Sequence, residues 1–101
     1  MLTSKQRAYL RSLAVNEETI LMVGKSGMSP EIVKQADDAL EKRELIKGRV
    51  LPETCPLSPR EAAEELAAGT ASEVVQVIGS RFVLYRRKKK DPVIVLPRTK
   101  A

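Results

Sequence analysis

The sequence predicts a single α/β (α+β, two-layer) domain with a four-stranded mixed sheet, and three observations support this prediction. A chain of 101 residues with 43% hydrophobic side chains can bury one modest core but not two. Its apolar residues follow helical and strand periods in the order helix, strand, helix, strand, helix, strand, strand. The last two strands are joined by Gly79-Ser80 and form an antiparallel hairpin, whereas a helix joins the first two and makes them parallel. The sequence leaves open whether the helices cover one face of the sheet or both.

The first half of the chain is expected to form two helices around one strand. A capping box at Thr3 begins a helix that runs to about Val15. Residues 20–23 are four consecutive apolar residues, which predict a buried strand that Gly24 ends. Ser29 is a good N-cap in front of a proline, so the second helix is expected over about residues 30–43.

The second half is expected to form strands at residues 45–51, 73–78 and 81–86 around a third helix, which begins after Ser58 and ends near residue 69. In the first of these strands Lys47 and Arg49 share one face. Gly48, between them, weakens the strand and marks either a bulge or the close approach of another backbone. Residues 93–96 form either a short edge strand or an ordered tail. We expect one domain over residues 1–97 and a disordered tail at 98–101.

Composition argues against several functional classes. The chain has no histidine and one cysteine, Cys55, so the commonest general base is absent and no cluster of nitrogen and sulfur ligands can hold a metal. We therefore expect no catalytic residues, no metal and no cofactor. No apolar run is long enough to span a bilayer and the N-terminus lacks a signal-peptide pattern, so we expect a cytoplasmic protein without a membrane partner. We also expect a monomer.

Positive charge is concentrated at the C-terminal end. Residues 1–79 carry ten Lys and Arg against twelve Asp and Glu, whereas residues 80–101 carry eight against one. Such a basic segment on a nearly neutral body indicates a polyanionic partner, for which nucleic acid is the first candidate, or else a solubilising tail.

The loop Gly24-Lys25-Ser26-Gly27 has three possible interpretations. A nucleotide-binding P-loop needs a further glycine at the position of Thr19, so that pattern is incomplete. A G-x-x-G backbone clamp of the kind used by KH domains would grip single-stranded RNA. The third interpretation is an ordinary tight turn. The two glycines, one lysine and a following helix start suit an anion.

Several segments together resemble a known family. They are residues 2–11, the loop at 24–27, residues 39–47, and residues 75–79 with 83–86. In these segments, and over nearly the whole chain from Leu2 to about Pro97, the sequence resembles the bacterial YhbY-like proteins, which are stand-alone CRM domains (chloroplast RNA splicing and ribosome maturation). It departs from the family pattern at Gly48, where a β-forming residue is usual, and at Ala71, where glycine usually follows Thr70.

The resemblance implies a fold similar to the C-terminal domain of translation initiation factor three. In that fold the sheet has the order 1-2-4-3 and its fourth strand is antiparallel to the others. The resemblance also implies RNA binding. Bacterial members associate with precursors of the large ribosomal subunit, and plant members act in intron splicing.

We therefore predict a non-enzymatic RNA-binding protein of ribosome assembly, with precursor rRNA as its partner and ribosomal proteins as further partners. The two loop glycines would permit close backbone approach, Lys25 would pair with phosphate and Ser26 would add a hydrogen bond. With one phenylalanine, two tyrosines and no tryptophan, backbone contact should outweigh base stacking. The alternative is an adaptor that docks on ribosomal proteins and touches RNA only through its basic tail. The predicted RNA-binding residues are Arg7, Arg11, Gly24, Lys25, Ser26, Gly27, Lys47, Arg49, Arg81, Arg86, Arg87, Lys88, Lys89 and Lys90. For Arg7 and Arg11, an ordinary solvated helix face is an equal alternative.

Overall fold

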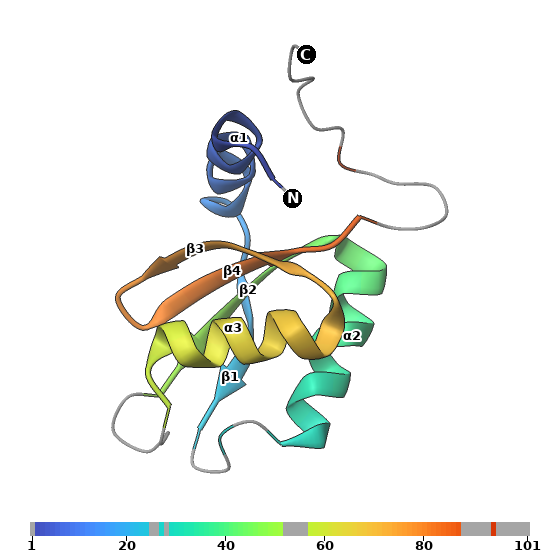
Figure 1. Ribbon diagram of the computed structural model, residues 1–101, viewed down its shortest axis with the longest axis vertical. Helices are drawn as coiled ribbons and strands as arrows, with labels where there is room; N and C mark the ends of the chain where they lie inside the picture. The colour runs from blue at the N-terminus through green and yellow to red at the C-terminus, as the bar shows by residue number, and fades with distance from the viewer. Residues whose placement is uncertain (1, 25–26, 28, 52–56, 88–93, 95–101) are drawn as a thin grey trace.

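The computed structural model describes residues 2–24, 27, 29–51, 57–87 and 94, and it shows an α+β fold (Figure 1). The helices and strands follow the predicted order: α1 (Ser4–Ala14), β1 (Thr19–Val23), α2 (Pro30–Arg43), β2 (Leu45–Val50), α3 (Pro59–Thr70), β3 (Glu73–Ile78) and β4 (Arg81–Tyr85). The expectations for Lys25, Ser26, Cys55, Lys88–Lys90 and the tail at 98–101 lie outside the described residues. So does the possible strand at 93–96, apart from Ile94.

The helix starts are confirmed as the sequence predicted them. Thr3 and Ser58 each accept a hydrogen bond from the backbone N–H three residues on and complete a capping box. Ser29 caps α2, whose first residue is Pro30. Each cap satisfies an N–H group that would otherwise lack a partner in the first turn, so the local sequence fixes where each helix begins. Among the described helices, none combines the length and the apolar character needed to cross a membrane.

The four strands form one mixed sheet in the order β1-β2-β4-β3. β1 and β2 are parallel, and β4 is antiparallel to both of its neighbours. This confirms the strand order and directions that the family resemblance implied. The pairing is irregular at two places: between Thr19 and Leu21 in β1, and between Val74 and Gln76 in β3.

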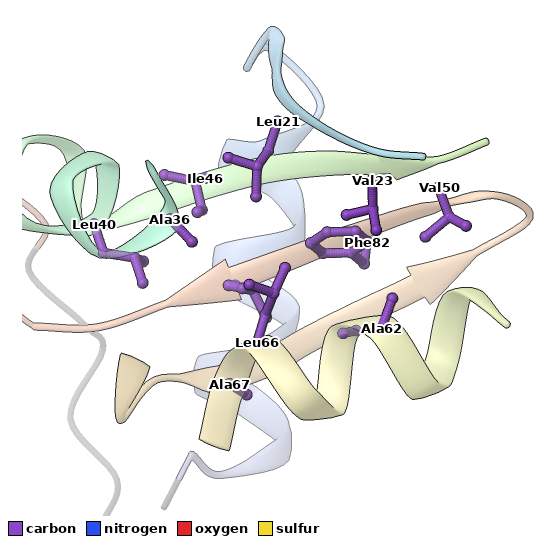
Figure 2. Packing of buried hydrophobic residues seen from close by; sticks show 12 residues of the cluster. Leu21, Val23, Ala36, Leu40, Ile46, Val50, Ala62, Leu66, Ala67 and Phe82 are labelled. Carbon is purple, nitrogen blue, oxygen red and sulfur yellow. The ribbon is translucent and has the colours of Figure 1, made fainter. Parts of the chain in front are cut away.

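The helices are divided over the two faces of the sheet, which the sequence had left open. α2 and α3 pack on one face, around Leu40, Ile46, Leu66, Phe82 and Leu84, and Figure 2 shows Phe82 within this cluster. α1 packs on the other face and buries a smaller cluster (Leu2, Leu10, Ala14, Leu45, Val75, Val83 and Tyr85). Because α1 is a single short helix, part of this face of the sheet is not covered by any described helix (Figure 1).

Gly48 of β2 packs against Phe82, which belongs to the larger of the two hydrophobic clusters, here called the large core. A Cβ atom on this residue would lie 2.3 Å from Cζ of Phe82, its partner on β4. The close neighbour is therefore an aromatic ring rather than another backbone. The irregularity nearby belongs to β1, across from Lys47 and Gly48. Glycine, in place of the β-forming residue that is usual in the family at this position, makes room for the ring of Phe82.

Candidate nucleic-acid interface

Gly24 and Gly27, the two glycines of the G-x-x-G loop, close a turn between β1 and α2. The N–H of Gly27 donates to the carbonyl of Gly24 at 2.9 Å, and the N–H of Ser29 donates to the carbonyl of Gly27 at 3.1 Å. Gly27 has a φ of 60°, in the left-handed region that glycine adopts without strain. The backbone conformation at this position therefore favours glycine, whether or not a ligand binds there.

A shallow depression of about 240 Å³ adjoins this turn. Gly24, Gly27 and Ser29 line it together with Met22 of β1 and Glu31 in the first turn of α2. The carboxylate of Glu31 offsets part of the positive charge at the helix start. In the described part of the chain, the turn thus offers backbone approach more than positive charge.

Positive charge is instead presented by the uncovered part of the sheet, on the α1 face. One row of paired residues crosses all four strands as Met22, Arg49, Arg81 and Ile78. In the next row Lys47 of β2 pairs with Val83 of β4, and Val83 pairs with Gln76 of β3. Residues paired across strands point to the same face, so three cations project from neighbouring positions of β2 and β4.

Helix α1 adds Arg11 to these three. A groove of about 320 Å³ runs between the C-terminal part of α1 and the sheet, and Arg11, Lys47 and Arg81 all line it. We call Arg11, Lys47, Arg49 and Arg81 the cationic sheet face. Three of the residues come from β2 and β4 and one from α1, so four predicted site residues from distant parts of the chain are brought together by the fold.

The side chains of the cationic sheet face make no ion pair with any described residue. Arg49 and Arg81 lie directly opposite each other, an arrangement that destabilises a sheet because like charges repel. The Nε atom of Arg49 is buried and has no hydrogen-bond partner in the described part of the chain. A bound anion would relieve the repulsion between the two guanidinium groups.

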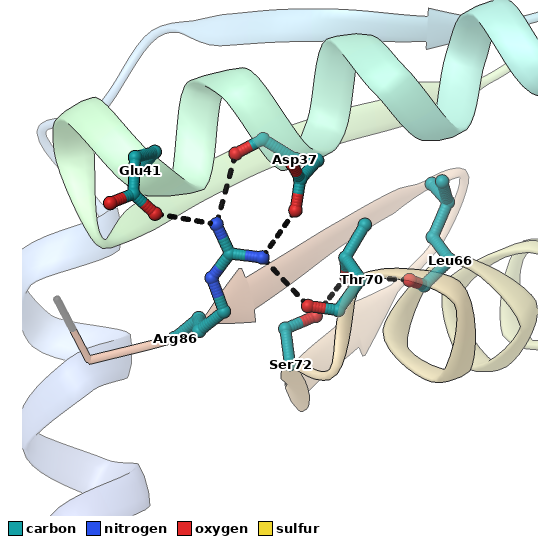
Figure 3. A network of polar contacts seen from close by, with 6 residues as sticks. All are labelled: Asp37, Glu41, Leu66, Thr70, Ser72 and Arg86. Atoms are coloured by element: carbon teal, nitrogen blue, oxygen red, sulfur yellow. Dashed lines mark hydrogen bonds and ion pairs between the residues drawn. The ribbon is translucent and has the colours of Figure 1, made fainter. Parts of the chain in front are cut away.

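Arg86 is a predicted RNA contact that the structure places elsewhere (Figure 3). One terminal nitrogen donates to Oδ1 of Asp37 at 2.5 Å and to the carbonyl of Thr70 at 2.8 Å. The other donates to Oε2 of Glu41 and to the carbonyl of Asp37, both at 3.1 Å. Its side chain is only 20% exposed. Arg86 therefore ties the end of β4 to α2 and α3, and its guanidinium is engaged within the fold.

Arg7 is also used within the fold, since its guanidinium donates to the carbonyl of Val74 at 2.8 Å and fastens α1 to β3. Arg87 is exposed at the end of the described chain segment. Lys25, Ser26 and Lys88–Lys90 cannot be placed, because they lie outside the described residues.

Sequence reasoning missed the uncharged residues around the cationic sheet face. Ile78 and Met22 are more than half exposed, although both are large apolar side chains in strands. Gln76 lines the groove together with Ile78. Strand alternation alone could not place Gln76 and Ile78, because the irregular pairing between Val74 and Gln76 shifts the faces of β3 part-way along the strand.

Comparison with known proteins gives consistent results. The CRS1 / YhbY (CRM) domain matches residues 2–86. The Probable RNA-binding protein YqeI of Bacillus subtilis is 44% identical over 97 residues, covering 96% of this chain and 100% of that protein. A protein of Haemophilus influenzae named RNA-binding protein is 33% identical over 100 residues, covering 96% of both chains.

A solved structure shares the fold of this chain. The solution structure of the hypothetical protein SAV1595 from Staphylococcus aureus matches with a TM-score of 0.78 and 49% sequence identity, covering 96% of this chain and 100% of that one. The family match covers most of the chain, and the relatives match it over nearly their full lengths. The chain therefore belongs to the CRS1 / YhbY (CRM) domain family.

Proposed function

We propose that this protein binds RNA of the precursor large ribosomal subunit during ribosome assembly, through its cationic sheet face and its G-x-x-G turn. The observation that carries the proposal is the gathering of Arg11, Lys47, Arg49 and Arg81 on one open face, without ion pairs to any described residue. Two of the relatives described above are named as RNA-binding proteins. The ribosomal target is supported by the family resemblance.

In this proposal the two parts of the site have different tasks. The cations bind phosphate oxygens, which fixes the RNA on the protein and makes binding sensitive to salt. The turn lets the RNA backbone come close, because Gly24 and Gly27 carry no side chains. Both parts lie at the same end of the sheet, since Gly24 follows β1 directly after the Met22–Arg49 pair and the Val23–Val50 pair. A single RNA strand could therefore contact both.

A charge placed in the turn tests its role. Gly27→Asp would set a carboxylate against phosphate, and we expect affinity for large-subunit rRNA fragments to fall about tenfold or more. The matched control is Ala71→Asp, which adds the same charge at another position with a positive φ, exposed at the end of α3. We expect the control to bind within about twofold of the wild type. A Gly27→Asp protein that is folded by circular dichroism and binds normally would remove the turn from the site.

The ribosomal assignment is tested in cells. In a sucrose gradient of a gentle-salt lysate, the protein should migrate with precursors of the large subunit and be depleted from translating ribosomes. Crosslinking followed by sequencing of the bound RNA should then recover large-subunit rRNA. An even distribution over polysomes, or protein only at the top of the gradient, would contradict the assignment while leaving RNA binding itself intact.

A second candidate function is a protein-binding adaptor with RNA contact only through the basic run at residues 87–90. The exposed Met22 and Ile78 favour it, because apolar residues are common at protein interfaces. Replacing residues 87–90 with alanine separates the two functions: an adaptor would lose essentially all RNA binding, whereas the proposed site would retain a weaker part that depends on Gly27. Truncation after Arg86 is a poorer test, because it would also remove contacts of the fold. Ile94 packs against the smaller cluster beneath α1, and its N–H donates to Glu44 at 2.8 Å.

A further inference from the structure

The groove beside the cationic sheet face is only partly charged. Besides Arg11, Lys47 and Arg81, it is lined by Gln76 and by four apolar residues, Ala14, Val15, Ile78 and Val83. Val15 is 76% exposed and Ile78 is 60% exposed, so their apolar surface is open to a ligand. None of the described lining residues is acidic. A site that only had to hold phosphate would gain nothing from these apolar walls.

The sheet register orders these groups across the groove. Arg81 is paired with Arg49 on one side and with Ile78 on the other, so the apolar side chain lies directly beside the cations. Gln76 is paired with Val83, one row closer to α1. Across the sheet from β2 to β3, two cationic side chains are thus followed by an apolar one, and the carboxamide of Gln76 lies in the adjoining row.

A nucleotide presents the same order of groups. Its phosphate is anionic, its base has an apolar face, and the edge of the base carries hydrogen-bond donors and acceptors. The carboxamide of glutamine can donate and accept at once, as base-edge recognition requires. At about 320 Å³ the groove is within the usual size range of small-ligand sites.

We propose that this groove holds one unstacked nucleotide of single-stranded RNA. The phosphate lies against Arg81 at the rim of the groove, on the side of its strand partner Arg49. The base packs on Ile78 and the neighbouring apolar wall, and the base edge faces Gln76. The inference rests on the proposed function and deepens it, because it adds a base-reading subsite to a surface otherwise expected to contact only the RNA backbone. Because the protein has few aromatic residues, aliphatic side chains contact the face of the base, where other RNA-binding proteins stack an aromatic ring on it.

The test compares a ligand that has bases with one that has none. The probes are single-stranded oligoadenylate, oligouridylate and oligocytidylate of about eight nucleotides, and inorganic polyphosphate of similar length. Ile78→Gln removes the apolar side chain next to Arg81 without changing charge. We expect it to weaken oligonucleotide binding about fivefold or more and to leave polyphosphate binding unchanged. Arg81→Gln should weaken binding to both kinds of probe, since it removes a phosphate contact.

Two further variants sharpen the test. Gln76→Leu should reduce the difference in affinity among the three oligonucleotides, because the base edge loses its hydrogen-bonding partner. The matched control is Tyr9→Gln, which also replaces a partly exposed apolar residue. Tyr9 and Arg11 are two residues apart on α1 and so lie on nearly opposite sides of the helix, which places Tyr9 away from the groove. This control should bind every probe as the wild type does.

Nuclear magnetic resonance supplies a measurement that needs no variant. Adding an oligonucleotide should shift the side-chain amide resonances of Gln76 and the methyl resonances of Ile78, whereas polyphosphate should leave the methyl resonances in place. If Ile78→Gln weakens both kinds of probe equally, or neither, the groove is an electrostatic surface and this inference fails while the proposed function stands. If an acidic peptide displaces the oligonucleotide and shifts the same methyl resonances more strongly, the groove belongs to a protein partner. If the wild type binds no RNA at all, the proposed function fails as well.

Discussion

Replacing Gly48 with alanine would place a methyl group against the ring of Phe82. The added Cβ would lie 2.3 Å from Cζ and 2.7 Å from Cε1 of that ring, far inside the contact distance of two carbon atoms. The ring cannot move aside easily, because Phe82 is 1% exposed and packed among the residues of the large core (Figure 2). The substitution must therefore either displace the ring or separate β2 from β4.

The expected cost follows from two opposing effects. Overpacking a core costs about 1–3 kcal/mol. Alanine recovers about 0.5–1 kcal/mol, because glycine loses more backbone freedom on folding. Because the added Cβ would lie so far inside contact distance, we take the upper end of the overpacking cost, and the free energy of unfolding should fall by about 2–2.5 kcal/mol. For a domain of this size this lowers the melting temperature by roughly 8–20 °C. Thermal and urea unfolding followed by circular dichroism measure both quantities.

A double-mutant cycle tests whether the ring is the cause. Phe82→Leu shortens the side chain at its far end, so Gly48→Ala should cost about 1 kcal/mol less in that background than in the wild type. Gly69→Ala is the control, because its Cβ would meet only Val33, at 3.3 Å, and alanine is favoured within a helix. The control should be neutral or stabilising. If Gly48→Ala were as stable as the wild type, or if the two substitutions were additive, the steric explanation would be refuted.

Three further predictions concern single side chains. Ala71 ends α3 with a φ of 54°, so Ala71→Gly should raise the free energy of unfolding in urea by about 0.5–1 kcal/mol; no gain would contradict the strained cap. Arg86→Gln should lower that free energy by about 1–2 kcal/mol while barely changing RNA affinity. A large loss of affinity in the folded variant would show that Arg86 contacts RNA. Burial, and secondarily the Glu44 carboxylate, raises the pKa of Tyr85 above its usual value of 10. Because Tyr85 then ionises at a lower pH in the unfolded chain than in the folded one, the free energy of unfolding should decline as the pH rises through 10 and above. Tyr85→Phe should lessen this decline and, because the Tyr85 hydroxyl has no partner among the described residues, should not reduce stability at neutral pH.

Local signals in the sequence predicted the fold well where each signal depends on neighbouring residues. The second helix was expected over about residues 30–43 and is found at Pro30–Arg43, because its cap, its proline and its apolar period all lie within the segment itself. The hairpin at Gly79-Ser80 was predicted for the same reason, and Gly79 has the positive φ that such a turn uses. The division of the helices over two faces depends on long-range packing, and no local signal indicated it.

The candidate site was only partly predictable, because sequence shows where the cations are but not which of them are already paired. In the sequence Arg86 begins a basic run, yet its acidic partners, Asp37 and Glu41, lie 49 and 45 residues away on α2. Conversely, Arg49 and Arg81 are 32 positions apart in the chain and become direct neighbours only through the β2–β4 register. The sequence predicted that Lys47 and Arg49 share a face, since that needs only strand alternation.

The opposition of Arg49 and Arg81 suggests that this part of the sheet is built for binding at some expense to stability. Like charges directly opposite in a sheet repel, and no described acidic residue pairs with either arginine. Arg81→Thr removes the repulsion and keeps a residue with high β-propensity. The suitable control is Arg60→Gln, which changes the net charge by the same amount but removes an attraction, since Arg60 lies 3.8 Å from Glu64.

If this reasoning is right, Arg81→Thr should be more stable than the wild type and bind RNA less well. The free energy of unfolding should rise by about 0.2–1 kcal/mol at low ionic strength. The gain should shrink as salt is added, because the Debye length falls to about 10 Å at 0.1 M. The slope of log affinity for single-stranded RNA against log salt concentration should flatten by about 0.7 if one phosphate contact is lost. Arg60→Gln should show a small loss of stability and no change in that slope. A less stable Arg81→Thr protein, or a stability gain that is independent of salt, would show that the two arginines do not repel each other in the free protein.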